Sequence, residues 1–198
     1  MQHPLYIIKI GGNVIDNDKK LFSFLQSFAC IKAPKILVHG GGKIATNIGN
    51  KLGIESKYIN GRRITDDATL DLVTMVYGGL INKKIVAQLQ SLKCNAIGLT
   101  GADGNLIPAV KRAPKALSFG EGLGEVIDYG WAGDIVNSKL KTDNLNALIN
   151  LNFVPVFAPL THDEQGHILN TNADTIASSL AIVLSKLYQV RLIYCFER

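Results

Sequence analysis

The segment that most limits how this chain can fold is Lys35–His39 together with the three glycines at residues 40–42. Its branched apolar side chains predict a short strand that is buried on both faces of a sheet. Three glycines in a row allow a sharp turn and bring backbone N–H groups close to a ligand. The helix-like residues 43–52 would add unpaired N–H donors and a positive dipole end. A tight turn without a ligand is the alternative, but three consecutive glycines favour a site for a carboxylate or a phosphate.

The same pattern occurs at the start of the chain. Residues 5–10 form an apolar run that contains Lys9, and Gly11 and Gly12 follow it. A lysine near the carboxyl end of a buried parallel strand is costly unless it meets an anion or water, and open α/β sheets bind their ligands at that edge. A lysine that faces solvent from an edge strand is the alternative. Residues 17–28 have apolar side chains at helical spacing, so repeated strand–helix units predict a mainly parallel sheet.

The rest of the chain continues these patterns. A long helix is expected up to residue 91, with Thr65 or Asp66 as its N-cap. Its Gly78-Gly79 pair would allow close packing, including packing against a second subunit, or would mark a break. The glycine-rich residues 113–137 lack a helical period and predict a β-hairpin insertion, either a flap over a substrate or a purely structural hairpin. Further strands are predicted at residues 96–99, 154–158 and 190–195, and further helices at residues 143–150 and from about 173 to 187.

Two polar segments carry side chains that suit an anionic ligand. Arg62 and Arg63 are adjacent in a turn-rich stretch, and an arginine forms a bidentate fork with a carboxylate; a solvated basic loop is the alternative. Asn170 and Asp174 flank Asn172 just before an apolar helix. Capping needs one of these three side chains, so Asn170 and Asp174 are predicted to face a ligand or to hold a catalytic lysine.

Composition excludes several classes of protein. The 198 residues suffice for one domain or one lobe, and the net charge of +5 is spread without a Lys/Arg block longer than two residues. We therefore expect no nucleic-acid partner. The apolar runs are shorter than the roughly 20 residues of a membrane helix, so no membrane partner is expected either. Cys30, Cys94 and Cys195 are odd in number and widely spaced, which predicts reduced thiols, packed as small hydrophobes, in a cytoplasmic protein without a cleaved leader.

A metal site is not predicted. His162 and His167 share one polar loop with Asp163 and Glu164, but the four side chains do not have the spacing of a usual ligand set. A dinucleotide-dependent dehydrogenase is also disfavoured. The first strand is not followed by G-x-G-x-x-G, and the second ends in His39 where that fold has an acidic residue.

Four motifs, in this order, resemble the amino acid kinase family: Lys9-Ile-Gly-Gly, His39-Gly-Gly-Gly, Asn60-Gly-Arg-Arg and Asn170-Thr-Asn-Ala-Asp. The resemblance implies an open, mainly parallel αβα sandwich that is usually a homodimer. It also implies a kinase of arginine biosynthesis that uses ATP, with Mg²⁺ carried by the nucleotide. The implied substrate is a small acylated glutamate, N-acetyl- or N-succinyl-L-glutamate, phosphorylated on its γ-carboxylate.

The resemblance also implies a role for each matching residue. Lys9 would stabilise the transferring phosphoryl group, and Asp174 would orient the catalytic lysines. Gly41 and Gly42 would offer N–H groups to the substrate near its γ-carboxylate. The remaining roles are ATP phosphate binding by Gly11 and Gly12, α-carboxylate binding by Arg63 and substrate binding by Asn170, with Arg62 at the variable position of its motif.

Phosphoryl transfer to a carboxylate needs no general base, because the acceptor is already ionised at neutral pH. Members of the family continue past the position of Arg198. We therefore expect residues 1–198 to be the N-terminal lobe that binds the acyl amino acid, with the ATP-binding lobe largely absent after residue 198. A non-catalytic module for acyl-amino-acid binding or dimerisation is the alternative.

Overall fold

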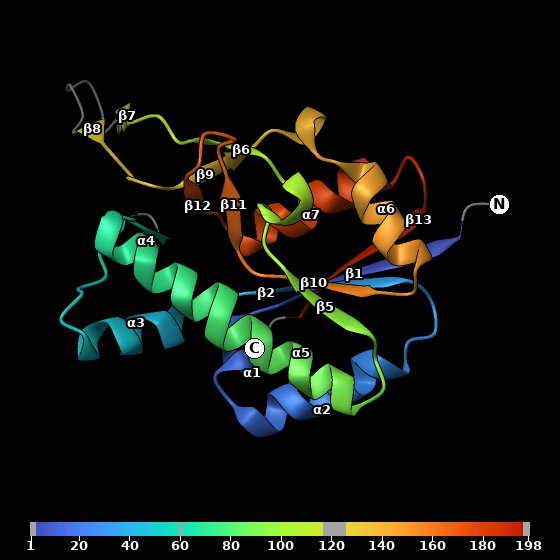
Figure 1. Cartoon of the computed structure of the whole chain (residues 1–198). Coiled ribbons are helices and arrows are strands. Elements are labelled where there is room, and N and C mark those ends of the chain that lie inside the picture. Colours follow the sequence, from blue (N-terminus) through green and yellow to red (C-terminus); the bar gives the residue numbers. More distant parts are fainter. Residues whose placement is uncertain (1–2, 60, 117–125, 196–198) are drawn as a thin grey trace.

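A computed structural model describes residues 3–59, 61–116 and 126–195. Five parallel strands form the central sheet in the order β13-β1-β2-β10-β5, which confirms the predicted open parallel sheet (Figure 1). β1 therefore lies inside the sheet, and the alternative of an edge-strand lysine at residue 9 is excluded. The strands are β1 (Pro4–Ile10), β2 (Lys35–His39), β5 (Ala96–Leu99), β10 (Val154–Phe157) and β13 (Gln189–Cys195).

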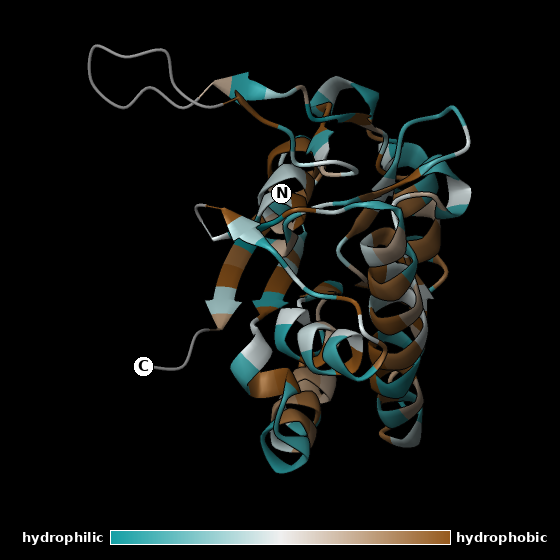
Figure 2. Cartoon of the chain, turned by 90° about the vertical axis from the view of Figure 1, so that its left-hand side faces the viewer, coloured by the Kyte–Doolittle hydropathy of each residue, from teal (hydrophilic) through white to brown (hydrophobic). Residues whose placement is uncertain are grey.

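Helices cover both faces of the sheet, because alternate residues of each inner strand point to opposite sides. Ile8 and Leu37 pack against α2 (Asp18–Cys30) and α5 (Asn82–Ser91), below the sheet in Figure 1. Ile7, Ile36 and Val38 pack on the other side, against α6 (Thr142–Asn150) and α7 (Ala173–Leu184). The central strands are accordingly hydrophobic for most of their length (Figure 2). This double burial is what the apolar runs predict.

The predicted long helix is continuous but is not α-helical throughout. It comprises α4 (Asp67–Val73), the π-helical segment η1 (Thr74–Ile81) and then α5. Asp66 is its N-cap and accepts a hydrogen bond from the Thr69 N–H at 2.8 Å. Gly78 and Gly79 lie within η1, so they mark a change of helical winding and not a chain break.

Short elements line the carboxyl edge of the sheet. Two short helices follow glycine turns, α1 (Gly12–Ile15) after β1 and α3 (Gly42–Lys51) after β2. Three antiparallel pairs complete the edge: β3 (Tyr58–Ile59) with β4 (Arg62–Arg63), β6 (Ala109–Lys111) with β9 (Gly133–Ile135), and β11 (Leu160–His162) with β12 (Ile168–Asn170).

The predicted hairpin insertion is described in part. β7 (Lys115–Ala116) pairs antiparallel with β8 (Val126–Ile127). The connection between them, residues 117–125, lies outside the described residues, as does Asn60 of the third motif. That the hairpin covers a substrate therefore stays a prediction.

Three expectations need correction or completion. Cys94 is buried and Cys195 half-buried, but Cys30 is exposed at the end of α2, so its prediction as a packed hydrophobe is wrong. The last helix ends at Leu184, three residues early, because the chain turns there to begin β13 at Gln189. Within the described ranges, every helix is too short or too polar to cross a bilayer.

Candidate functional site

A cleft of about 270 Å³ opens at the carboxyl edge of the sheet, between the glycine turns and the short β-pairs. Its lining includes all eight residues that the sequence singles out: Lys9, Gly11, Gly12, Gly41, Gly42, Arg63, Asn170 and Asp174. They come from β1, β4, β12 and α7, from the turns after β1 and β2, and from the first residues of α1 and α3. The parallel topology therefore gathers four separate sequence motifs into one cleft, although their individual roles remain predictions.

Lys9 and Asp174 form an ion pair in this cleft. The Lys9 Nζ lies 2.9 Å from the Asp174 Oδ1, and the side chains are 9% and 45% exposed. Asp174 stands in the first turn of α7, where Asn172 caps the helix by accepting the N–H groups of Asp174 and Thr175 at 2.8 and 3.1 Å. A carboxylate suits this position because the helix dipole is positive there. The pair compensates the cost of placing an ammonium group at the end of a buried strand.

The glycine turn after β2 leaves little room for a side chain at its centre. Gly41 has a φ of +148°, and a Cβ at this position would lie 2.3 Å from Ile81 Cδ1 of η1. The Gly40 N–H donates to the Ile10 carbonyl at 3.1 Å, which ties the turn to the end of β1. Helix α3 then begins at Gly42, so its first N–H groups are left for other partners.

Arg63 is buried and already has partners within the protein. Its NH2 group donates to the Gly42 carbonyl and to Thr46 Oγ1, both at 2.9 Å, and its NH1 group donates to Ser56 Oγ. Its guanidinium group also lies over the Tyr58 ring, 4.8 Å from the centroid. Arg63 thus fastens the β3–β4 pair onto the first turn of α3, so its donor capacity for a substrate carboxylate is only partly available.

Asn170 lies at the end of β12, and its Nδ2 donates to the buried Thr65 Oγ1 at 3.0 Å. Because the amide nitrogen faces Thr65, the orientation of the amide is set by the fold. The Asn170 backbone N–H donates to the Trp131 carbonyl at 2.8 Å. β12 and the segment before β9 are thereby held together on one side of the cleft.

Tyr77 and Arg112 are among the lining residues that the sequence did not indicate. Tyr77 of η1 is 5% exposed, and burial raises the pKa of its hydroxyl. Its aromatic ring in an apolar helical stretch suggests only a core residue. Arg112 pairs with Asp134, with Nε 3.0 Å from Oδ2, and this hydrogen bond lowers the pKa of the Asp134 carboxyl. Arg112 follows β6 outside any motif, so nothing in the sequence pointed to it.

The charges around the cleft favour an anion. Among the described residues, its lining carries the cations Lys9, Arg62, Arg63 and Arg112 and one carboxylate, that of Asp174. Such an excess of positive charge in a concave site raises the local concentration of anionic ligands.

A second hollow of about 280 Å³ lies beside the cleft and shares Lys9, Gly11 and Gly12 with it. Asp16 and Lys43 also line this hollow, with Lys43 Nζ 3.9 Å from an Asp16 carboxylate oxygen, and burial raises the pKa of Asp16. Gly11 and Gly12 therefore lie between the cleft and the second hollow, so ligands in both spaces could contact their backbone.

His162 ends β11, and His167 lies in the loop before β12. His167 Nδ1 lies 2.7 Å from Asp163 Oδ2, and its ring stacks on Trp131 with centroids 4.9 Å apart. Throughout the described ranges, no group of three or more His, Cys, Asp or Glu side chains is arranged to hold a metal ion.

Comparison with known proteins matches this arrangement to a family. Residues 4–188 match the sequence profile described as the amino acid kinase family. This chain belongs to the amino acid kinase family. Among curated relatives in that family, the acetylglutamate kinase of Cytophaga hutchinsonii is 56% identical over 98% of this chain and 69% of its own length. The acetylglutamate kinase of Bacteroides thetaiotaomicron is 52% identical over 100% of this chain and 72% of its own length.

Solved structures share the fold of this family member. The protein smu.665 from Streptococcus mutans superimposes with a TM-score of 0.73 at 22% identity, covering 91% of this chain and 69% of its own. The N-acetylglutamate synthase of Neisseria gonorrhoeae, solved with coenzyme A and N-acetyl-glutamate, gives 0.73 at 20% identity, covering 96% of this chain and 41% of its own. At these identities the comparison establishes the fold alone.

Proposed function

We propose that this chain is an acetylglutamate kinase, which transfers the γ-phosphoryl group of ATP to the γ-carboxylate of N-acetyl-L-glutamate. In this reaction a carboxylate oxygen forms a bond to the γ-phosphorus, the bond to the β–γ bridging oxygen breaks, and ADP leaves with that electron pair. One observation carries the proposal. Lys9, the glycine turn, Arg63 and Asn170 converge on one basic cleft, in a chain 52–56% identical to acetylglutamate kinases.

The residues of the cleft can supply what this reaction needs. Two anions must approach each other, so catalysis depends on positioning and on neutralising charge. In our proposal the N–H groups of Gly41 and Gly42 bind the γ-carboxylate, and Lys9, held by Asp174, stabilises the transferring phosphoryl group. Arg63 and Asn170 bind the rest of the acyl amino acid.

ATP is proposed to approach Gly11 and Gly12 with its phosphates. These glycines lack side chains that would block the approach, and Lys9 and Lys43 line the neighbouring hollow. Mg²⁺ would arrive bound to the phosphates, where it neutralises part of their charge.

A coupled assay for ADP release tests this function. Purified protein is given ATP, Mg²⁺ and either N-acetyl- or N-succinyl-L-glutamate, and the faster substrate identifies the acyl group. Calorimetry of the same sample measures binding of the acylglutamate and of ATP separately. Absence of both turnover and acylglutamate binding would contradict the proposal.

We also propose that residues 1–198 are the lobe that binds the acyl amino acid, because every residue assigned to that substrate lies within them. The chain spans 69–72% of the two curated relatives compared above. A second candidate function is an acylglutamate-binding module without turnover of its own. Acylglutamate binding without ATP binding in the calorimetric experiment would favour this module.

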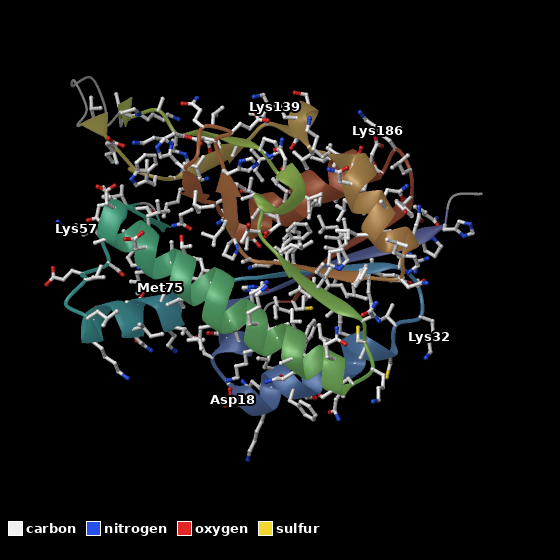
Figure 3. The ribbon with its side chains drawn as sticks, in the orientation of Figure 1. Asp18, Lys32, Lys57, Met75, Lys139 and Lys186 are labelled. Carbon is white, nitrogen blue, oxygen red and sulfur yellow. The ribbon has the colours of Figure 1, made fainter. Side chains whose placement is uncertain are left out.

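A homodimer is the proposed assembly. Met75 and Leu80 expose 57% and 52% of their surface on η1, and no described atom lies within 4 Å of a Cβ built at Gly79 (Figure 3 labels Met75). This apolar face, with a small residue at its centre, suits a second copy of the same helix. Light scattering should give about twice 21.4 kDa. Leu80→Glu should shift the protein to monomer, whereas Leu151→Glu at the exposed end of α6 should not.

Its location is proposed to be cytoplasmic. Cys30, Cys94 and Cys195 are all free, and free thiols are typical of reducing compartments. Fractionation of cells that produce the native gene product, followed by immunodetection, tests this location.

A further inference from the structure

His39 is a completely buried histidine beside the glycine turn, and the proposed reaction gives it no chemical role. It ends β2, and its relative exposure is 0%. Its Nδ1 lies 2.8 Å from the Gly40 carbonyl oxygen. Its Nε2 lies 3.2 Å from Nδ2 of Asn82, a residue that is itself 1% exposed. Both ring nitrogens thus have a partner, one in the turn and one at the start of α5.

The hydrogen bonds of Asn82 determine which ring nitrogen carries the proton. Asn82 Nδ2 donates to the Val156 carbonyl at 2.9 Å, and a carbonyl can only accept, so the amide nitrogen must face this side. The second hydrogen of Nδ2 then points to His39 Nε2, which accepts it. The proton of the neutral ring therefore sits on Nδ1 and is donated to the Gly40 carbonyl. Burial lowers the pKa of His39 to about 4, which keeps the ring neutral at physiological pH.

The bond to Gly40 has a direct geometric effect on Gly41. The Gly40 carbonyl and the Gly41 N–H belong to the same peptide unit, and in a trans peptide they point in opposite directions. The described part of the chain contains no cis peptide bond. A carbonyl that is held by His39 therefore leaves the Gly41 N–H on the opposite side of the peptide unit, and Gly41 is one of the residues that line the cleft.

Asn82 is itself fixed by tight packing. It contacts the end of β2 through His39 and the middle of β10 through Val156, and its Oδ1 would lie 2.0 Å from a Cβ at Gly98 of β5. A glycine at residue 98 therefore makes room for the amide. The link from the turn through His39 to Asn82 is thus anchored to three strands and to the long helix.

We propose that His39 and Asn82 form a positioning pair that fixes the Gly40 carbonyl and thereby aims the Gly41 N–H at the acyl amino acid. This inference rests on the proposed function, in which Gly41 binds that substrate. His39 touches no reacting atom in this arrangement, so it acts through the backbone of the turn.

Nitrogen NMR of protein labelled with ¹⁵N-histidine tests the pair without any ligand. The expected result is a neutral His39 ring protonated on Nδ1 at neutral pH and still neutral at pH 5.5. An Nε2-protonated ring, or a ring that titrates near 6.5, would overturn the proposal.

Three substitutions then test the consequence for binding. In His39→Asn the side-chain amide can replace the Nδ1 donor, whereas His39→Gln can replace only the Nε2 acceptor and His39→Leu neither. We expect the Kd for N-acetylglutamate to stay within about threefold of wild type in His39→Asn. In His39→Gln and His39→Leu it should rise about tenfold, which is the effect of losing one hydrogen bond. Circular dichroism must show each variant folded.

Equal binding by all folded variants, or failure of Asn to bind better than Leu, would overturn the positioning role. If the wild-type protein binds no acylglutamate, the proposed function fails. In that case the tautomer of His39, together with hydrogen exchange at the Gly41 amide in the three variants, decides whether the pair orients the turn. If hydrogen exchange at the Gly41 amide is unchanged in His39→Gln and His39→Leu, the pair does not orient the turn.

Discussion

The ammonium group of Lys9 and the carboxylate of Asp174 lie 2.9 Å apart, although they come from the first strand and the last helix of the chain. The pair joins both ends of the fold at the floor of the cleft. Its geometry makes the position of the Lys9 ammonium dependent on where α7 begins, and that position is set by the Asn172 cap.

Replacement of Lys9 by methionine should abolish most of the turnover. The variant keeps the length of the side chain and removes the charge that faces the transferring phosphoryl group, so kcat should fall by about 10² to 10³. Steady-state ADP release measures this loss. Lys51→Met, at the exposed end of α3, is the matched control and should retain wild-type kinetics. Unchanged kcat in Lys9→Met would remove this lysine from the mechanism.

Asp174→Asn should lower kcat about tenfold and leave the KM for acylglutamate nearly unchanged, because the amide no longer fixes Lys9. A double-mutant cycle with Lys9→Met should show strong non-additivity, since both changes act on one ion pair. Additive effects would mean that Asp174 has a function separate from Lys9.

Gly41→Ala should destabilise the fold by about 1–3 kcal/mol and weaken acylglutamate binding. The added methyl group meets Ile81 Cδ1 at 2.3 Å and the backbone has a positive φ. Ile81→Val removes that Cδ1 atom. The double variant Gly41→Ala/Ile81→Val should therefore recover, in thermal unfolding, the part of the lost stability that is due to the clash. Gly53→Ala gives the cost of a positive φ without a clash, because φ is +75° there and no described atom lies within 4 Å. Equal destabilisation by the two single alanine variants would argue against the clash.

Stability should rise with pH between about 4 and 6.5 because of His39. In this window the unfolded chain binds a proton at His39 and the folded chain does not, since burial lowers the pKa to about 4. The loss on acidification should approach about 3 kcal/mol at the lower end of the window. Urea unfolding at several pH values measures this change in the free energy of unfolding. His39→Asn is the control: subtracting its pH profile from that of wild type removes the contribution of the carboxyl groups, which both proteins share. Parallel pH profiles would show that folding does not lower the pKa of His39.

Arg63→Lys should raise the KM for acylglutamate at least about tenfold. A lysine cannot reproduce the bonds to Gly42 and Thr46 while also facing a substrate carboxylate. Arg62→Lys, at the exposed neighbouring position, provides the comparison and should have a smaller effect. A larger effect at Arg62 would reverse the assignment of the two arginines.

Much of the fold and of the site follows from local sequence. The apolar runs fix the parallel strands because both faces are buried, and glycines directly after two of those strands place the turns at one edge of the sheet. Lys9 was predictable for the same reason, since a charged residue in such a run needs a partner. Where its partner lies was less certain, because capping alone could explain Asp174.

Other features depend on long-range packing and could not be predicted. Tyr77 looks like any core aromatic until η1 brings it to the cleft, and Arg112 comes from a segment without a regular pattern. The internal bonds of Arg63 depend on how β4 meets α3. The exposed position of Cys30 at the end of α2 likewise follows from where that helix stops on the surface.

The π-helical winding of η1 determines which face of α5 packs on the sheet. Ile81 reaches Gly41 and Asn82 reaches His39 because the helix is out of step with regular α-helical phase between α4 and α5. The same residues wound as an α-helix would complete more turns, so α5 would be rotated about its axis and Ile85 and Leu89 would turn away from the core. A substitution that restored α-helical winding in η1 would therefore disturb the core and the His39–Asn82 link together.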